Sequence, residues 1–180
     1  DRYYLPDSAG VAFSRNLYRW TPQIRREDGF MRLVWGLGTR AVDRVGSDYP
    51  RLVALSHPLL HPKTSAQAIR RYSQQEVDVI DLQENTFRSV AVSELMRPNY
   101  PALRYIVQID QGDYMTPIRM MLHEADHNNL VVTFDELLRR TPLAHRMSRM
   151  LQILEKNYLS PVDTEFTACV SAADTANPEI

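Results

Sequence analysis

Cysteine is almost absent from this 180-residue sequence, which contains Cys169 alone. A single cysteine can form neither an intramolecular disulfide nor a cysteine-based zinc site, so disulfide scaffolds and cysteine zinc modules are excluded. Long apolar runs are also missing, because no stretch approaches the roughly 18 residues needed to cross a bilayer. The first residues lack the basic and apolar segments of a secretory signal. We therefore expect a soluble, unsecreted, cytoplasmic protein with no membrane partner.

A large excess of one charge is lacking as well. The net charge of −1 argues against a general nucleic-acid binder, although the charges are unevenly distributed. Residues 1–73 carry 12 basic and 6 acidic side chains, whereas residues 74–180 carry 9 and 16. The basic half favours a polyphosphate ligand, and two differently charged solvated faces explain the asymmetry equally well. Trp20 and three arginines in the loop of residues 17–28 suit phosphate or RNA, or simply a solvated loop.

The length and the hydrophobic content of 44% predict one hydrophobic core, and so a single domain over residues 1–180. The first residue is Asp1 rather than methionine. We therefore expect this domain to be a piece of a longer protein.

A glycine turn between an apolar strand and a short helix is the most distinctive local pattern. Residues 30–35 are apolar and aromatic enough for a buried strand, Gly36-Leu-Gly38 permits unusual backbone angles, and Thr39 begins a predicted helix to residue 45. The start of a helix presents unpaired N–H groups that suit a phosphate. The pattern is neither GxGxxG nor a P-loop, so an ordinary strand-to-helix turn stays open as the alternative.

The rest of the chain alternates between strand and helix patterns. Residues 9–16, 51–56 and 162–170 read as strands, and residues 77–82 with 86–92 and residues 103–109 with 115–122 read as hairpins. Thr64 or Ser65 caps a helix to about Tyr72, and Thr133 with Glu136 forms a capping box for a helix to Arg140. Thr141-Pro142 opens the longest amphipathic helix, which Ser160-Pro161 ends and which we expect to pack on the sheet.

A zinc-peptidase pattern, His123-Glu-Ala-Asp-His127, is present in the sequence but in the wrong context. The HExxH motif requires a helix, whereas residues 118–122 resemble a strand and Asn128-Asn129 interrupts any helix. Thr133 also stands where the extended motif has its third histidine. A polar turn between strands is the better interpretation.

Two carboxylates near the C-terminal end of the chain favour a cation site. Asp163 and Glu165 lie at positions i and i+2 of a predicted strand, so they project from the same face about 6 to 7 Å apart. This arrangement suits a hard cation such as Mg²⁺, and an ordinary polar strand face is the alternative.

Three blocks of sequence together resemble a known family. They are Ser8-Ala-Gly-Val-Ala-Phe-Ser-Arg-Asn16, Leu33-Val-Trp-Gly-Leu-Gly38 and the stretch from Leu154 to Phe166. In this order they resemble the "SGVxFTRNP", "WGLGE" and "HYGRPxDIEW" motifs of the N-terminal ATP-binding domain of phosphoenolpyruvate synthase and pyruvate phosphate dikinase. The resemblance implies an α+β fold, the C-terminal subdomain of an ATP-grasp domain, with a largely antiparallel sheet and helices packed on one face.

The resemblance also implies a function and a set of site residues. ATP and Mg²⁺ are the implied cofactors, Glu165 is the implied metal ligand, and Asp163 supports it in catalysis. Gly36, Gly38 and Thr39 are expected to line the phosphate side of the cleft. The implied activity is a dikinase-type phosphotransfer from ATP to a histidine on a mobile domain.

Departures from the family pattern leave a second interpretation open. Thr39 and Arg40 occupy the position of the family's acidic residue and the position after it. The upstream ATP-grasp half and the phosphohistidine domain are missing from the sequence, so we expect a fragment that is inactive alone and whose partners are those missing parts. A degenerate ATP-grasp module with a regulatory or interaction role is the alternative.

Overall fold

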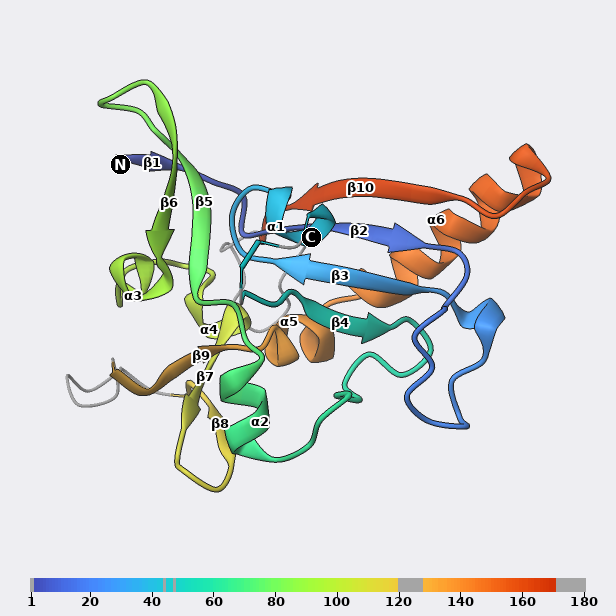
Figure 1. Cartoon of the computed structure of the whole chain (residues 1–180), viewed down its shortest axis with the longest axis horizontal. Helices are drawn as coiled ribbons and strands as arrows, with labels where there is room; N and C mark the ends of the chain where they lie inside the picture. Colours follow the sequence, from blue (N-terminus) through green and yellow to red (C-terminus); the bar gives the residue numbers. More distant parts are fainter. Residues whose placement is uncertain (1, 44, 47, 120–127, 171–180) are drawn as a thin grey trace.

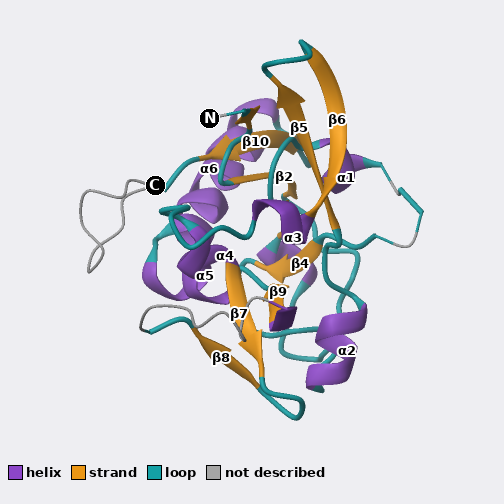
Figure 2. Cartoon of the chain, turned by 90° about the vertical axis from the view of Figure 1, so that its left-hand side faces the viewer, coloured by secondary structure: helices purple, strands orange, loops and turns teal. Residues whose placement is uncertain are grey.

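The described part of the protein is an α+β structure with three antiparallel sheets (Figures 1 and 2). The structure is a computed structural model and describes residues 2–43, 45–46, 48–119 and 128–170. The central sheet has the strand order β10-β2-β3-β4. Its strands are β2 (Ser8–Phe13), β3 (Phe30–Val34), β4 (Arg51–Ala54) and β10 (Asp163–Ala168). The predicted fold class is thereby confirmed.

The two faces of the central sheet differ in what covers them. On the inner face, Ala12, Met31 and Leu33 join the main core with the buried apolar residues of the long helix α6 (Leu143–Tyr158). The preceding helix α5 (Asp135–Arg140) packs into the same core. Both helices therefore cover one face, as predicted. The short helix α1 (Thr39–Val42) lies on the opposite, outer face, where its Ala41 packs against β2 and β3.

Two smaller sheets flank the central one. The first has the order β1-β5-β6, from Tyr3–Tyr4, Glu76–Asp81 and Thr86–Ala91, and its hairpin projects from the molecule (Figure 2). The second has the order β8-β7-β9, from Met115–Pro117, Val107–Asp110 and Leu130–Val132. The remaining helices of the described residues are the 3-10 turn η1 (Arg26–Asp28), α2 (Ala66–Arg71), α3 (Val92–Leu95) and α4 (Leu103–Ile106). Within the described residues, no helix combines the length and apolar character that a membrane crossing needs.

Two local predictions were wrong. Leu103–Ile106 is a helical turn rather than the start of a strand, because this conformation buries Leu103, Tyr105 and Ile106 together in the core. The hairpin that follows is real but begins only at β7. The capping box is absent as well, since the Glu136 carboxylate accepts hydrogen bonds from Arg139 and Arg140. The motif from His123 to His127 lies outside the described residues.

Contacts with Gln74 and with strand β5 fix the glycine turn that follows β3. The side chain of Gln74 bonds both backbone groups of Trp35, at 2.8 and 2.9 Å. Gly36 has a φ of 87° and forms a bridge to Asp78 on β5. A Cβ at this position would lie 2.4 Å from Val77 Cγ1 and 2.6 Å from the Asp78 carbonyl oxygen. Glycine at position 36 is therefore a packing requirement of the fold.

We expect Gly36→Ala to lower the free energy of unfolding by about 2 to 4 kcal/mol, because it combines a positive φ with overpacking. Gly38→Ala is the matched control, since Gly38 lies in the αR region and a Cβ added there would meet Ala9 Cβ at an ordinary 3.6 Å. Urea unfolding of both variants measures the difference. Equal losses in the two variants would contradict this account of the turn.

Candidate functional site

The predicted metal-site carboxylates lie on the outer face of an edge strand. In the register of β10 with β2, Asp163 is opposite Phe13 and Glu165 is opposite Val11. Both carboxylates are exposed, and neither forms an ion pair with another described residue. The structure therefore places the two side chains on one face, as the i, i+2 spacing predicted, and leaves their oxygen atoms free to bind a cation.

Both ends of β10 are fixed to distant parts of the chain. At its beginning, Ser14 N donates to Val162 O at 2.9 Å, and Val162 N donates to Ser14 Oγ at 3.0 Å. Beyond its end, Val170 N donates to an Asp7 carboxylate oxygen at 2.7 Å. Asp7 also accepts a 2.5 Å hydrogen bond from Tyr100, and burial together with Asp7 raises the pKa of the Tyr100 hydroxyl. Glu165 therefore projects from a strand that cannot shift its register freely.

The outer face of the central sheet continues across all four strands. We define it by the side chains that the strand register places on the same side as Glu165, namely Asp163, Glu165 and Thr167 on β10, Ala9, Val11 and Phe13 on β2, Phe30, Arg32 and Val34 on β3, and Leu52 and Ala54 on β4. Helix α1 covers part of this face, where its Ala41 forms a buried cluster with Ala9, Val11 and Val34. Aromatic side chains cover one end. Phe13 stacks on Phe30 with the ring centroids 4.6 Å apart, and Tyr18 contacts Phe30 edge-on.

The residues of the glycine turn contact two different parts of the structure. The N–H groups of Gly36 and Leu37 donate to Pro6 O and Asp78 O, so they are already occupied. Gly38 lies over Ala9, which is opposite Thr167 on β10, two residues beyond Glu165. Thr39 is exposed at the start of α1. The structure therefore brings Gly38 and Thr39 to the face that carries Glu165, whereas Gly36 packs against β5.

Arg40, which follows Thr39, is a structural residue of the fold. Its side chain is 5% exposed, and its guanidinium donates to Asp78, Asp48 and Glu76 at 2.9, 3.0 and 2.7 Å and to Ser89 at 3.0 Å. Burial acts to lower the pKa of Arg40, but the hydrogen bond and charge of Asp78 together with the charges of Asp48 and Glu76 raise the pKa above its usual value. The guanidinium therefore points into the sheet of β5 and β6 and is not available to a ligand.

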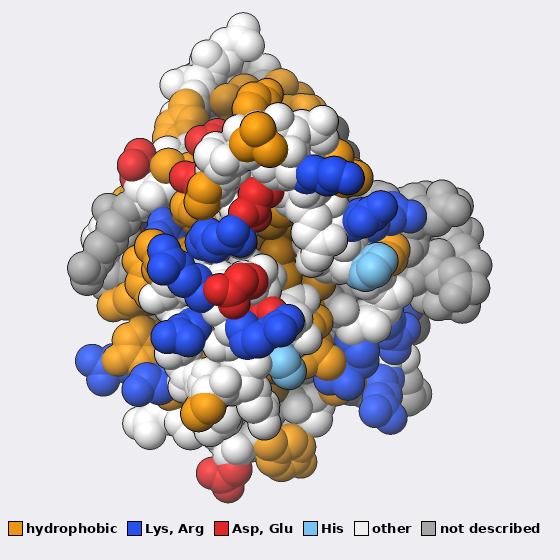
Figure 3. All heavy atoms as spheres, turned by 90° about the vertical axis from the view of Figure 1, so that its right-hand side faces the viewer, with side chains coloured by type: hydrophobic (Ala, Val, Ile, Leu, Met, Phe, Trp, Pro, Cys, Tyr) orange, Lys and Arg blue, Asp and Glu red, His pale blue; other side chains and the backbone are white. Residues whose placement is uncertain are grey.

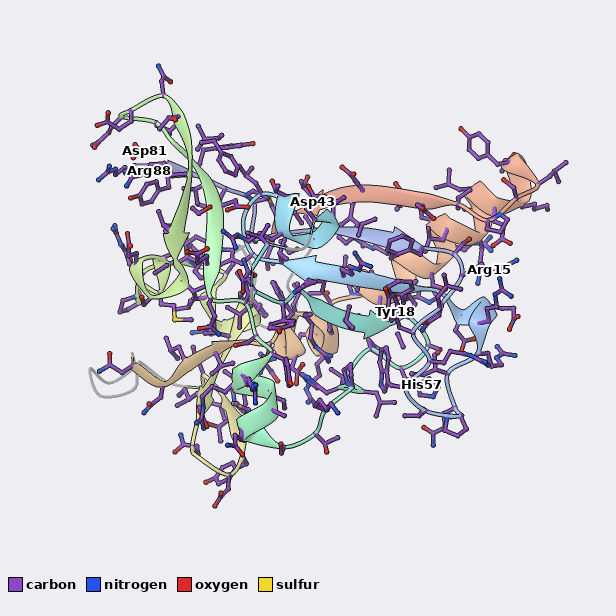
Figure 4. The ribbon with its side chains drawn as sticks, viewed as in Figure 1. Arg15, Tyr18, Asp43, His57, Asp81 and Arg88 are labelled. Carbon is purple, nitrogen blue, oxygen red and sulfur yellow. The ribbon has the colours of Figure 1, made fainter. Side chains whose placement is uncertain are left out.

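The arginine-rich loop of residues 17–28 is also partly neutralised. Arg25 pairs with Asp28 at 3.0 Å, and Arg15 just before the loop pairs with Glu155 on α6. Figure 3 shows Lys and Arg side chains interleaved with Asp and Glu on this side of the molecule. In Figure 4, Arg15 and Tyr18 lie toward one end of the central sheet, and Asp43 lies beside α1. This side therefore presents a mixed charge rather than a basic patch.

A separate apolar pocket of about 240 Å³ lies near β4, at the sheet edge opposite β10. Tyr49, Leu52 and Tyr72 contribute to its walls, and none of its lining residues is acidic. Burial lowers the pKa of Arg51, which lines this pocket, to about 10, although the nearby Asp135 opposes the change. Asp135 also binds His61 at 2.8 Å. Because it lacks a carboxylate lining and lies across the sheet from β10, this pocket is not the predicted metal site.

The described residues contain no group of three or more His, Cys, Asp or Glu side chains placed to hold a metal. This finding argues against a closed, all-protein metal cage in that part of the chain. Mg²⁺ commonly binds through one or two carboxylates together with substrate phosphates and water. Glu165 and Asp163 are exposed oxygen donors of that kind, so the residues present fit a magnesium ion that arrives with a nucleotide.

A comparison with protein families shows to which family the chain belongs. Residues 2–175 match the family described as pyruvate phosphate dikinase, AMP/ATP-binding domain. The chain belongs to this family. Comparisons with curated proteins and with solved structures gave no match. Membership confirms the resemblance seen in the three sequence blocks, and it supports a nucleotide-binding role with ATP as a ligand.

Sequence reasoning missed the contact of Arg32 with two aromatic rings at the outer face. Arg32 interrupts the apolar run of β3, and its guanidinium lies over the rings of Phe13 and Tyr18. A basic residue in the middle of an otherwise apolar strand was the available signal. The pairing of Arg32 with the two rings could not be foreseen, because Tyr18 reaches the sheet from a loop.

We expect Arg40→Met to lower the free energy of unfolding by about 3 to 5 kcal/mol, because it leaves buried carboxylates without their cation. Arg32→Met is the matched control, since Arg32 has no carboxylate partner among the described residues and its loss should cost about 1 kcal/mol or less. Chemical denaturation of both variants checks this. An unchanged free energy of unfolding in Arg40→Met would show that the ion pairs of Arg40 do not hold α1 and the central sheet against the β1-β5-β6 sheet.

Proposed function

We propose that the chain is the C-terminal subdomain of an ATP-grasp domain in a dikinase-type phosphotransferase. In this role it binds Mg·ATP and contributes to transfer of a phosphoryl group from ATP to a histidine on a mobile domain. The observation that carries the proposal is the placement of Glu165, Gly38 and Thr39 on one face of a chain from the AMP/ATP-binding family.

The carboxylates have distinct roles in this proposal. Glu165 lies nearer the turn in the register, so its carboxylate binds the metal together with phosphate oxygens. Asp163 lies two residues earlier on the same face and supports the metal through water or a direct contact. When bound, Mg²⁺ offsets the negative charge that develops on the phosphate oxygens during transfer.

The turn contributes a surface rather than a set of backbone donors. Gly38 allows a ligand to approach closely above Ala9, and the Thr39 hydroxyl is exposed beside it. A hydroxyl can donate to a phosphate oxygen, whereas a carboxylate at the same place would repel it. Thr39 in place of the family's acidic residue is therefore compatible with phosphate contact in this chain.

The outer face forms only one side of a nucleotide site. Asp163 and Glu165 are exposed on it, and α1 and the aromatic residues cover other parts of it. We assign the opposing side to the upstream ATP-grasp half and the acceptor histidine to a phosphohistidine domain of the same cytoplasmic protein. On this proposal, residues 1–180 act as one domain that does not turn over ATP alone.

One observation favours a second function, that of a regulatory module that binds nucleotide without catalysis. Arg40 and the N–H groups of Gly36 and Leu37 are all used within the fold, so the turn offers few donors to a phosphate. In that case the complete protein binds ATP but acquires no phosphohistidine.

The test measures Mg·ATP affinity and protein phosphorylation in the complete gene product that contains this domain. We expect Glu165→Gln to weaken Mg·ATP binding at least tenfold, about 1.4 kcal/mol, because an amide does not replace a carboxylate as a magnesium ligand. Isothermal titration gives the affinity, and ³²P-labelled ATP reveals an acid-labile, base-stable phosphohistidine.

Glu94→Gln is the control, because Glu94 is an exposed carboxylate on α3, away from the outer face. Unchanged affinity and phosphorylation in Glu165→Gln would remove Glu165 from the mechanism. Tight ATP binding without any phosphohistidine would favour the regulatory module.

A further inference from the structure

Arg32 is the single basic residue among the outer-face side chains, and it shares a cross-strand row with Glu165. Glu165 is opposite Val11 on β2, and Val11 is opposite Arg32 on β3. With neighbouring strands about 4.8 Å apart, the Cα atoms of Glu165 and Arg32 are about 10 Å apart. Both side chains rise from the same face. Val11 between them is buried under α1 and its neighbours, so a ligand that contacts both side chains would lie outside the layer that covers Val11.

The guanidinium of Arg32 is held in place without being neutralised. Its Nη1 donates to the Ala41 carbonyl oxygen at 3.3 Å, and its Cζ lies 5.5 Å from the Phe13 ring centroid and 5.9 Å from that of Tyr18. No carboxylate of the described residues forms an ion pair with it. The Nε and Nη2 groups likewise form no hydrogen bond to another described residue.

The other shielded arginines behave differently. Arg40 has three carboxylate partners, and Arg51 has Asp135 together with three backbone carbonyl oxygens. A partly desolvated cation is costly unless an anion offsets it. Arg32 is half-buried and lacks that anion within the described structure, which indicates that the anion is supplied by a ligand.

We propose that Arg32 binds the polyphosphate of the nucleotide on the outer face, opposite the metal held by Glu165. This inference rests on the proposed function and adds a phosphate-binding residue to it. The planar guanidinium has two unused donor groups, which suit adjacent phosphate oxygens, while Phe13 and Tyr18 restrict its orientation. Arg32 thus makes the site selective for nucleotides with several phosphates.

The experiment compares ATP and AMP binding, each with excess Mg²⁺, in the complete gene product. We expect Arg32→Met to weaken ATP binding about 10- to 100-fold, because charge-assisted hydrogen bonds to phosphate are lost. AMP affinity should change far less, so the ATP-to-AMP affinity ratio should fall about tenfold. A merely structural role for Arg32 would lower both affinities equally and leave this ratio unchanged.

Two further variants keep the test decisive. Arg32→Lys preserves the charge and the fold but not the paired donors, so its ATP affinity should lie between those of the wild type and Arg32→Met. Arg26→Met removes an exposed arginine of η1 and should change neither affinity. Inorganic tripolyphosphate should displace ATP from the wild type and do so less effectively from Arg32→Lys.

The outcomes separate this inference from the proposed function. If the wild type fails to bind Mg·ATP, the result contradicts both the proposed function and this inference. If Glu165→Gln weakens ATP binding while Arg32→Met and Arg32→Lys leave the ATP-to-AMP ratio unchanged, the nucleotide site stands and the role of Arg32 is overturned.

Discussion

The ion cluster around Arg40 is the interaction on which the arrangement of the sheets depends. The Arg40 guanidinium extends from α1 and donates to Asp78 and Ser89 in the β5–β6 hairpin and to Asp48 in the segment before β4. Because the cation and two of its carboxylates are nearly inaccessible to water, removal of either partner leaves an uncompensated charge. Helix α1 and the glycine turn therefore keep their positions through a contact that has no part in ligand binding.

Much of the fold follows from alternation and turn chemistry. The strands β2, β3, β5 and β6 were predicted because their apolar residues alternate or form short buried runs, and α6 because its apolar residues keep helical spacing. The errors occur where tertiary contacts override local patterns. In α4, three closely spaced apolar residues are buried together, and in α5 the arginines of the last turn compete for Glu136.

The candidate site was predictable to the extent that strand geometry determines it. Residues two apart on a strand share a face, so the relation of Asp163 to Glu165 needed no structure. The relation of both to Gly38 and Arg32 depends on which strands are neighbours, which spacing does not specify. Gly36 illustrates the opposite case: the glycine pattern suggested a phosphate contact, whereas the structure explains this glycine by the close approach of β5.

The pairing of β2 with β10 joins residues 8–13 to residues 163–168, near opposite ends of the chain. Such a contact closes a very long loop, which makes it one of the entropically costly steps of folding. During synthesis, the edge of β2 that pairs with β10 stays unpaired until residues 163–168 have been made. The carboxylates proposed to bind magnesium thus lie on the last of the described strands, so nucleotide binding would indicate that this long-range pairing has formed.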